Sequence, residues 1–97
     1  MNSRILIIYE YQILYQILNE ISESLNFEII QSNEKDLKEF NFDQKNNYLI
    51  ISEKKIERVK NSLILDNLPI KFEKLIEIIN IKFLKNKFLD QSHIKIG

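Results

Sequence analysis

Few side chains in this sequence have a type and spacing that support chemistry. Two carboxylates lie at the ends of predicted strands. Glu10 follows Tyr9, and Glu53 follows Ser52. A carboxylate at a strand end can hold a cation or move a proton, but no second titratable group with a recognisable role accompanies either one. Such single carboxylates are more typical of solvated caps, or of surface partners for a lysine such as Lys54. The pattern predicts no catalytic residues.

The other residue types that commonly carry chemistry are isolated or absent. His93 has no Ser, Cys or acidic partner at a recognisable spacing. The absence of cysteine excludes disulfide bonds, thiolate zinc sites and thiol catalysis. The only glycine is Gly97, so no glycine-rich loop can approach a phosphate. We therefore expect neither an enzyme nor a bound metal or cofactor.

Length and charge indicate one small globular domain. The chain has 97 residues, 44% of them apolar, and its 14 basic and 14 acidic residues cancel. No net field then draws it toward nucleic acid or a membrane, and the basic runs Lys54-Lys55 and Lys82–Lys87 indicate a solvated face. The apolar run Ile5–Ile8 is too short for a signal peptide or a membrane span. We predict a cytoplasmic domain without membrane contact.

Apolar runs and helical periodicity alternate along the chain, which predicts the α/β class with a parallel sheet and right-handed crossovers. The predicted strands are Arg4–Ile8, Phe27–Ile30, Tyr48–Ile51 and Leu63–Leu65. The predicted helices are 11–26, 33–40, 54–61 and the longer 72–88. The apolar stripe expected to bury the first helix consists of Ile13, Leu14, Ile17, Leu18, Ile21 and Leu25. Ser32 or Asn33 caps the second helix, and residues 43–47 form a polar loop.

The junction before the last helix resembles that of a known family. Leu68–Leu75 is similar, position by position, to the Lys-Pro-aromatic turn and following helix of response-regulator receiver domains, which are flavodoxin-like. Residues Arg4–Asn33 resemble a receiver's first strand, first helix and second strand, and Ser92–Gly97 resembles the start of an OmpR-type winged-helix effector domain. The resemblance implies about four parallel strands in the order 2-1-3-4, with helices on both faces and a long C-terminal helix. It also implies a receiver-like domain over 1–89, and a linker or first effector strand over 90–97.

The chain departs from the family at the phosphorylation site that the resemblance implies. A receiver holds Mg²⁺ with an acidic pair after its first strand and accepts phosphate on an Asp that ends its third strand. The matching positions here are Tyr9 and Glu10, and then either Ser52 or Glu53. We therefore predict a pseudo-receiver that neither binds Mg²⁺ tightly nor accepts phosphate. With Glu53 at the acceptor position, the chain would instead mimic a permanently phosphorylated receiver.

The turn before the last helix departs from the family in the same direction. Leu68 replaces the lysine that neutralises the phosphoryl group, although Pro69 occupies the family proline, which commonly adopts the cis form. Residues 53–61 are too few to contain the strand and helix that read phosphorylation in the family. The phosphate-sensing parts of a receiver are therefore missing.

The last predicted helix, 72–88, has more apolar surface than packing against the sheet would cover. Its main stripe consists of Phe72, Leu75, Ile76, Ile79 and Phe83. Four further apolar residues widen this face: Ile78, Ile81, Leu84 and Phe88. Either the helix is buried deeply in its own domain, or these four residues form a homodimer interface. We favour the homodimer, which would also cover the sheet edge left bare by the missing strand.

Two functions are compatible with these observations. The first is a phosphorylation-independent dimerisation and regulatory module of a DNA-binding transcription regulator, which contacts DNA only through a winged-helix domain beginning near Ile94. The strand-like ending at Gly97 predicts that the reading frame continues. The second is a free-standing domain that binds a small ligand or protein partner at the carboxyl ends of its strands. That cleft would be lined by Tyr9, Glu10, Ser52, Glu53 and Leu68.

Overall fold

The chain divides into two units, Met1–Asp66 and Asn67–Gly97. The structure is a computed structural model that describes residues 3–40, 46–56, 62–66 and 70–96, with side chains up to Lys85 in the last range. The first unit contains all the strands and the shorter helices, and the second contains one long helix.

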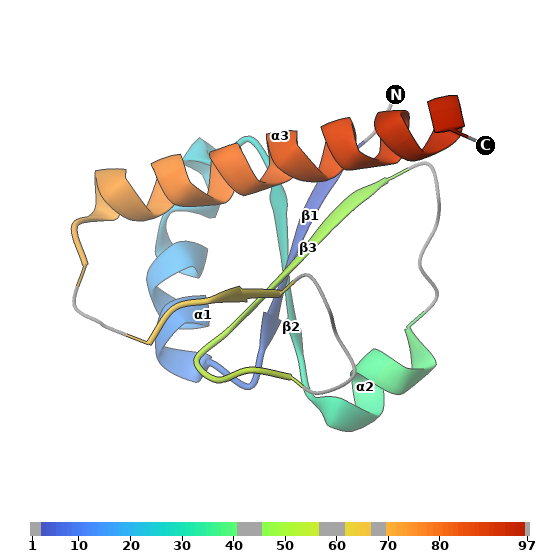
Figure 1. The fold of residues 1–97 in the computed structure, drawn as a ribbon. Coiled ribbons are helices and arrows are strands. Elements are labelled where there is room, and N and C mark those ends of the chain that lie inside the picture. The colour runs from blue at the N-terminus through green and yellow to red at the C-terminus, as the bar shows by residue number, and fades with distance from the viewer. Residues whose placement is uncertain (1–2, 41–45, 57–61, 67–69, 97) are drawn as a thin grey trace. The chain divides into compact units, whose positions relative to one another are not determined.

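The first unit is built on a four-stranded parallel sheet (Figure 1). Its strands are β1 (Arg4–Tyr9), β2 (Glu28–Ser32), β3 (Asn47–Ser52) and β4 (Ser62–Ile64). Their order is β2-β1-β3-β4, and every neighbouring pair is parallel. This architecture confirms the predicted α/β fold and the strand order 2-1-3-4.

Strand β1 lies inside the sheet and is covered on both faces. All four residues from Ile5 to Ile8 are buried, as their continuous apolar character predicts. In the register of the sheet, Leu6 pairs with Ile29 of β2 on one side and with Leu49 of β3 on the other. The middle of the sheet is therefore an apolar layer to which three strands contribute.

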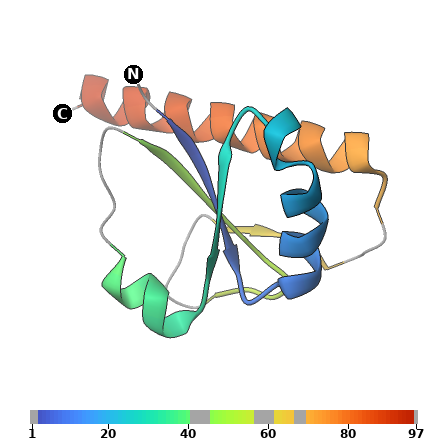
Figure 2. The ribbon, with the colours of Figure 1, turned by 180° about the vertical axis from the view of Figure 1, so that it is seen from behind.

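Helix α1 (Gln12–Glu20) is shorter than its sequence pattern predicts. It ends at Ile21, and a short 3₁₀ turn, η1 (Ser22–Ser24), follows it. The expected cap at Asn26 is therefore wrong, since the Ile21 amide bonds back to Leu18 and tightens the last turn. Seen from either side in Figures 1 and 2, α1 and the next helix, α2 (Glu34–Glu39), lie in different parts of the first unit.

The predicted apolar stripe of α1 is only partly buried. Leu14 and Leu18 are fully buried, whereas Ile13 and Ile17 are exposed. Successive helical residues are about 100° apart, so a short helix that contacts its surroundings along one line covers positions 14 and 18 and leaves positions 13 and 17 outside. The burial expected for Ile13 and Ile17 was wrong.

Helix α2 (Glu34–Glu39) begins at the cap Asn33, whose side chain accepts a hydrogen bond of 2.8 Å from the Asp36 amide. Leu37 and Phe40 pack against a buried cluster of Ile5, Ile7 and Ile50. Because Ile5 and Ile7 alternate with Leu6 and Ile8, this cluster occupies one face of the sheet, which α2 covers.

Two predicted segments fall largely outside the described residues. The helix expected over 54–61 is not formed by Lys54–Ile56, and its remainder lies in the undescribed range 57–61. Most of the polar loop expected over 43–47 also lies outside the described part of the chain. Even so, β3 and β4 pair in parallel, with Ile51 opposite Leu63, so the short connection suffices for this crossover.

The second unit contains helix α3 (Phe72–Ile96). Leu75, Ile79 and Phe83 are buried at four-residue spacing, but Phe72, which was expected to belong to their stripe, is exposed. Residues 90–96 are helical, so the strand that was one of the two structures expected there is wrong, because no proline or glycine interrupts the helix before Ile96. Within the described ranges, no helix has the length and apolar character needed to cross a membrane.

The cap of α2 provides a test of this local structure. We expect Asn33→Ala to lower the free energy of unfolding by about 1 kcal/mol, because the Asp36 amide loses its acceptor. The measurement is urea denaturation followed by circular dichroism.

Lys38→Ala is the matched control on the same helix. Lys38 lies 3.7 Å from Glu34 in an exposed ion pair, so its loss should cost less than about 0.5 kcal/mol. Equal effects of the two substitutions would contradict the capping role of Asn33.

Candidate functional site

The register of the sheet places two of the predicted site residues, Tyr9 and Ser52, in one row at the carboxyl ends of the strands. Tyr9 pairs with Ser32 of β2 and with Ser52 of β3, and Ser52 pairs with Ile64 of β4. Open parallel sheets bind their ligands outside this edge. This row is therefore the candidate functional site of the first unit.

Ser52 is the last residue of β3 and is almost completely buried, with 2% of its surface exposed. Its hydroxyl donates a hydrogen bond of 2.7 Å to the main-chain carbonyl of Lys54. Glu53 is the first residue beyond the strand, and it is exposed. Of the two residues considered for the acceptor position, one is thus a buried hydroxyl with a structural partner and the other is a solvated carboxylate.

Tyr9 and Ser32 complete the middle of the row without offering a reactive group. The Tyr9 side chain is half-buried and packs against the cluster of Ile5, Ile7 and Ile50. Ser32 is buried, and its hydroxyl donates to the carbonyl of Asn33 at 3.3 Å. The sequence marked Ser32 only as a possible helix cap, because its position in the row depends on the register between strands.

Glu10 has a backbone conformation that non-glycine residues seldom adopt. Its φ is 46°, in the left-handed region, and its amide donates to the Ser32 carbonyl at 2.9 Å. This bond continues the pairing of β1 with β2 by one residue and turns the chain toward α1. The Glu10 side chain is exposed and so is not held as a buried ligand.

A shallow hollow of about 410 Å³ lies beside Glu10 at the carboxyl edge. It is lined by Glu10, Tyr11, Gln12, Gln31, Ser32, Asn33 and Asp36. Of the residues predicted to line a ligand cleft, only Glu10 takes part. The hollow therefore lies on the β2 side of β1, whereas Ser52 and Glu53 belong to β3.

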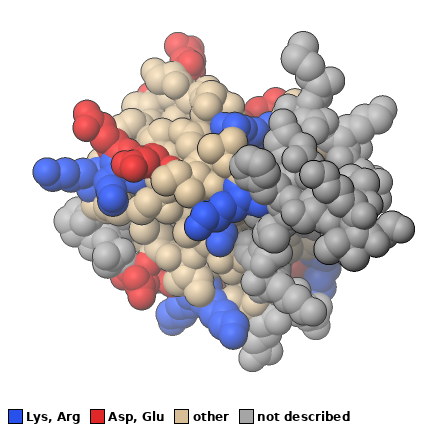
Figure 3. Space-filling model, turned by 45° about the horizontal axis from the view of Figure 1, so that its top comes forward, with Lys and Arg blue, Asp and Glu red and all other residues tan. Residues whose placement is uncertain are grey.

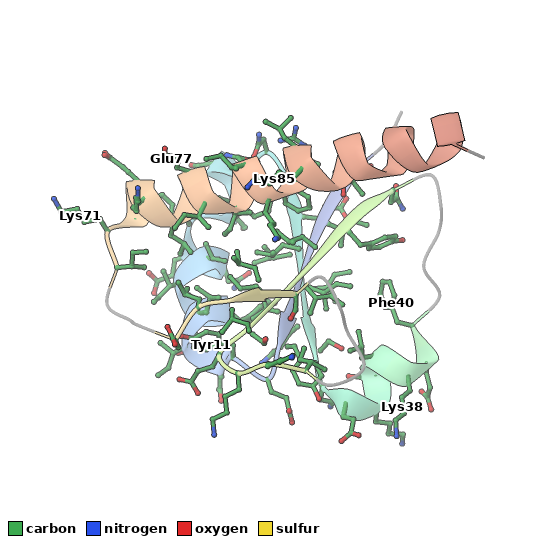
Figure 4. All side chains as sticks on the ribbon, viewed as in Figure 1. Tyr11, Lys38, Phe40, Lys71, Glu77 and Lys85 are labelled. Carbon is green, nitrogen blue, oxygen red and sulfur yellow. The ribbon has the colours of Figure 1, made fainter. Side chains whose placement is uncertain are left out.

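Tyr11 makes the longest-range side-chain hydrogen bond at this edge. It is 5% exposed, and its hydroxyl donates to the Leu65 carbonyl at 2.8 Å (Figure 4). The Leu65 amide in turn donates to the Ser52 carbonyl at 2.9 Å. No pattern in the sequence indicates this contact, because Tyr11 and Leu65 are far apart along the chain.

The surroundings of Tyr11 keep its hydroxyl protonated. Burial raises the pKa of the Tyr11 phenol, and the carboxylates of Glu53 and Asp66 raise it further. A neutral phenol donates its proton to Leu65, whereas a phenolate cannot. The local charges therefore favour the form that makes the hydrogen bond.

No metal centre is evident at this edge or elsewhere in the described ranges. Among the residues with described placement, no three His, Cys, Asp or Glu side chains lie close enough together to hold a metal ion. Leu68, which the sequence comparison set against the receiver lysine, and the cis-proline candidate Pro69 lie outside those ranges, as does the side chain of His93. On the face shown in Figure 3, described acidic and basic side chains are interspersed.

Comparison of the chain with protein-family models, with curated proteins and with solved structures finds no match in any of the three. The receiver resemblance therefore remains a prediction from the sequence.

The Tyr11 hydrogen bond predicts a pH-dependent contribution to stability. Tyr11→Phe should lower the free energy of unfolding by about 1 kcal/mol at neutral pH, since the Leu65 carbonyl loses its donor. The pKa of Tyr11 is raised above its unfolded value of 10.0, so this contribution is complete below pH 10 and is lost as the pH rises through the folded pKa.

The measurement is the difference in unfolding free energy between wild type and Tyr11→Phe, from urea denaturation at neutral and at alkaline pH. Taking the difference cancels the titration of the other tyrosines and the lysines. A difference that did not shrink above pH 10 would contradict the role of the hydroxyl proton.

Proposed function

We propose that this chain is a phosphorylation-independent pseudo-receiver, and that it serves as a dimerisation and regulatory module of a cytoplasmic, DNA-binding transcription regulator. One observation carries the proposal. The three buried hydroxyl groups at the carboxyl edge, those of Tyr11, Ser32 and Ser52, all donate to main-chain carbonyls. The edge that holds the reactive groups of a receiver is here occupied by structural hydrogen bonds.

Phosphoryl transfer depends on charges held in position around the transferred group. Glu10 and Glu53 are the carboxylates nearest the expected positions, and both are exposed. Ser52 cannot replace an aspartate as a Mg²⁺ ligand of comparable strength, because a neutral hydroxyl lacks the charge that this hard cation prefers. These features support a receiver-like scaffold that works without phosphorylation and has no enzymatic activity.

Helix α3 supports the dimerisation part of the proposal. Ile81 and Leu84 are 44% and 46% exposed and lie on the side of the helix opposite the buried residues Leu75, Ile79 and Phe83. Ile78, at the border of this exposed face, is half-buried. Phe88 was also predicted for the interface, but its side chain lies outside the described residues. A chain with a net charge of zero can bring two copies together without long-range repulsion.

Contact with DNA belongs to a following winged-helix domain in this proposal. Because α3 continues to Ile96, that domain would not begin with a strand at Ile94. The module itself needs only a stable fold and a self-complementary surface.

Ligand binding at the carboxyl edge remains a second candidate, favoured by the hollow beside Glu10. Ligand pockets of this size are usually lined mainly by apolar side chains. This one is lined mostly by polar residues, among them the two carboxylates of Glu10 and Asp36. Ligand binding therefore ranks below the interaction module.

Incubation with Mg²⁺ and acetyl phosphate tests the absence of phosphorylation. We expect the intact mass of the chain to stay unchanged, because no aspartate ends β3. A phosphorylatable receiver treated in parallel is the positive control. A gain equal to one phosphoryl group, mapped to Ser52 or Glu53, would refute the proposal.

The double substitution Ile81→Glu and Leu84→Glu tests the dimer. We expect light scattering to give twice the chain mass for the wild type and a single-chain mass for the variant, since four buried charges would oppose association. Ile13→Glu is the matched control, because Ile13 is 63% exposed but lies on α1. A wild-type monomer, or a variant that still forms dimers, would contradict this interface.

A further inference from the structure

Leu65 is held at both of its main-chain polar atoms. Its amide donates to the carbonyl of Ser52, the last residue of β3, at 2.9 Å, and its carbonyl accepts from the Tyr11 hydroxyl at 2.8 Å. Its side chain is buried as well. Leu65 directly follows the last residue of β4, and its amide bond to Ser52 is the last one in the described pairing of β3 with β4. The ends of such pairings are ordinarily the first to open.

The position of Leu65 in the chain gives this attachment its importance. The first unit ends at Asp66, so Leu65 is its penultimate residue, and the second unit begins at Asn67. Within the described ranges, a side-chain hydrogen bond reaches the segment 62–66 from Tyr11. Tyr11 itself precedes α1, whose Tyr15 amide bonds to the Tyr11 carbonyl and so fixes its backbone.

We infer that the Tyr11 hydroxyl fixes the main chain at Leu65, the point at which the chain leaves the first unit, and so acts as a positioning residue for the end of that unit. The hydrogen bond from the Leu65 amide to the Ser52 carbonyl fixes the position of Leu65 along β3. The hydrogen bond from the Tyr11 hydroxyl restrains the orientation of the Leu65 carbonyl. Leu65 is thereby hydrogen-bonded to the turn between β1 and α1. This turn lies at the edge of the sheet where a receiver carries its phosphorylation site. This inference does not depend on the proposed function, because it follows from contacts within the first unit.

The groups around the phenol suit this role. Glu53 and Asp66, which flank the two ends of the connection from β3 through β4, both act on Tyr11 electrostatically. Their negative charges oppose formation of a phenolate and so keep the hydroxyl as a donor. The Tyr11 hydroxyl donates its hydrogen bond to the carbonyl of Leu65, and not to either of these two carboxylates.

Hydrogen exchange of single amides, followed by NMR at neutral pH, tests the inference. In Tyr11→Phe we expect the Leu65 amide to exchange about fivefold faster, which corresponds to losing one ordinary hydrogen bond that opposes local opening. The amides of Ile7 and Ile8, in the buried strand β1, should change less than that of Leu65. Tyr15→Phe is the matched control, because no hydrogen bond joins the Tyr15 hydroxyl to another residue of the described ranges.

The comparison separates a local role from a general one. Selective acceleration at Leu65 in Tyr11→Phe, without the same change in Tyr15→Phe, supports the inference. An equal acceleration at Leu65, Ile7 and Ile8 would show that Tyr11 contributes only to overall stability, and would overturn it. No acceleration, or a Tyr11→Phe chain that does not fold, would overturn it as well.

Discussion

Burial of both faces of β1 is the constraint on which the first unit depends. The run from Ile5 to Ile8 is apolar at every position, so neither face of this strand can be left in water. Each fully buried side chain of this kind contributes about 1.5–3 kcal/mol relative to an exposed one. The strand must therefore lie inside the sheet with a covering layer on each face, and β2 and β3 flank it. Parallel pairing follows, because the crossovers between strands supply those layers.

A sheet built in this way leaves its polar groups at the strand ends. At the carboxyl edge of this chain, the hydroxyls of Ser32, Ser52 and Tyr11 are buried and donate to carbonyls of the main chain. A buried hydroxyl without a partner would cost free energy, so these bonds stabilise the edge. The same bonds occupy the positions at which an open parallel sheet usually places reactive groups.

The strands were predictable because a continuous apolar run indicates burial on both faces, whatever surrounds it. The helices were predicted less well. The periodicity of α1 did not show that Ile13 and Ile17 would be exposed, because the width of the buried stripe depends on the surface that the helix meets. The isoleucines near the end of α3 looked like a strand but are helical, since local β propensity yields to the continuity of a helix without a breaker.

The sequence by itself determined the α/β class, the four strands, and the absence of thiol and glycine-loop chemistry. These properties depend on residue type and on short-range spacing. Only the tertiary structure decided that Ser52 is buried and bonded, and that Tyr11 holds Leu65. The Tyr11 bond joins residues that are far apart along the chain, and the burial of Ser52 depends on the strands paired beside it, so neither follows from the local pattern of residues.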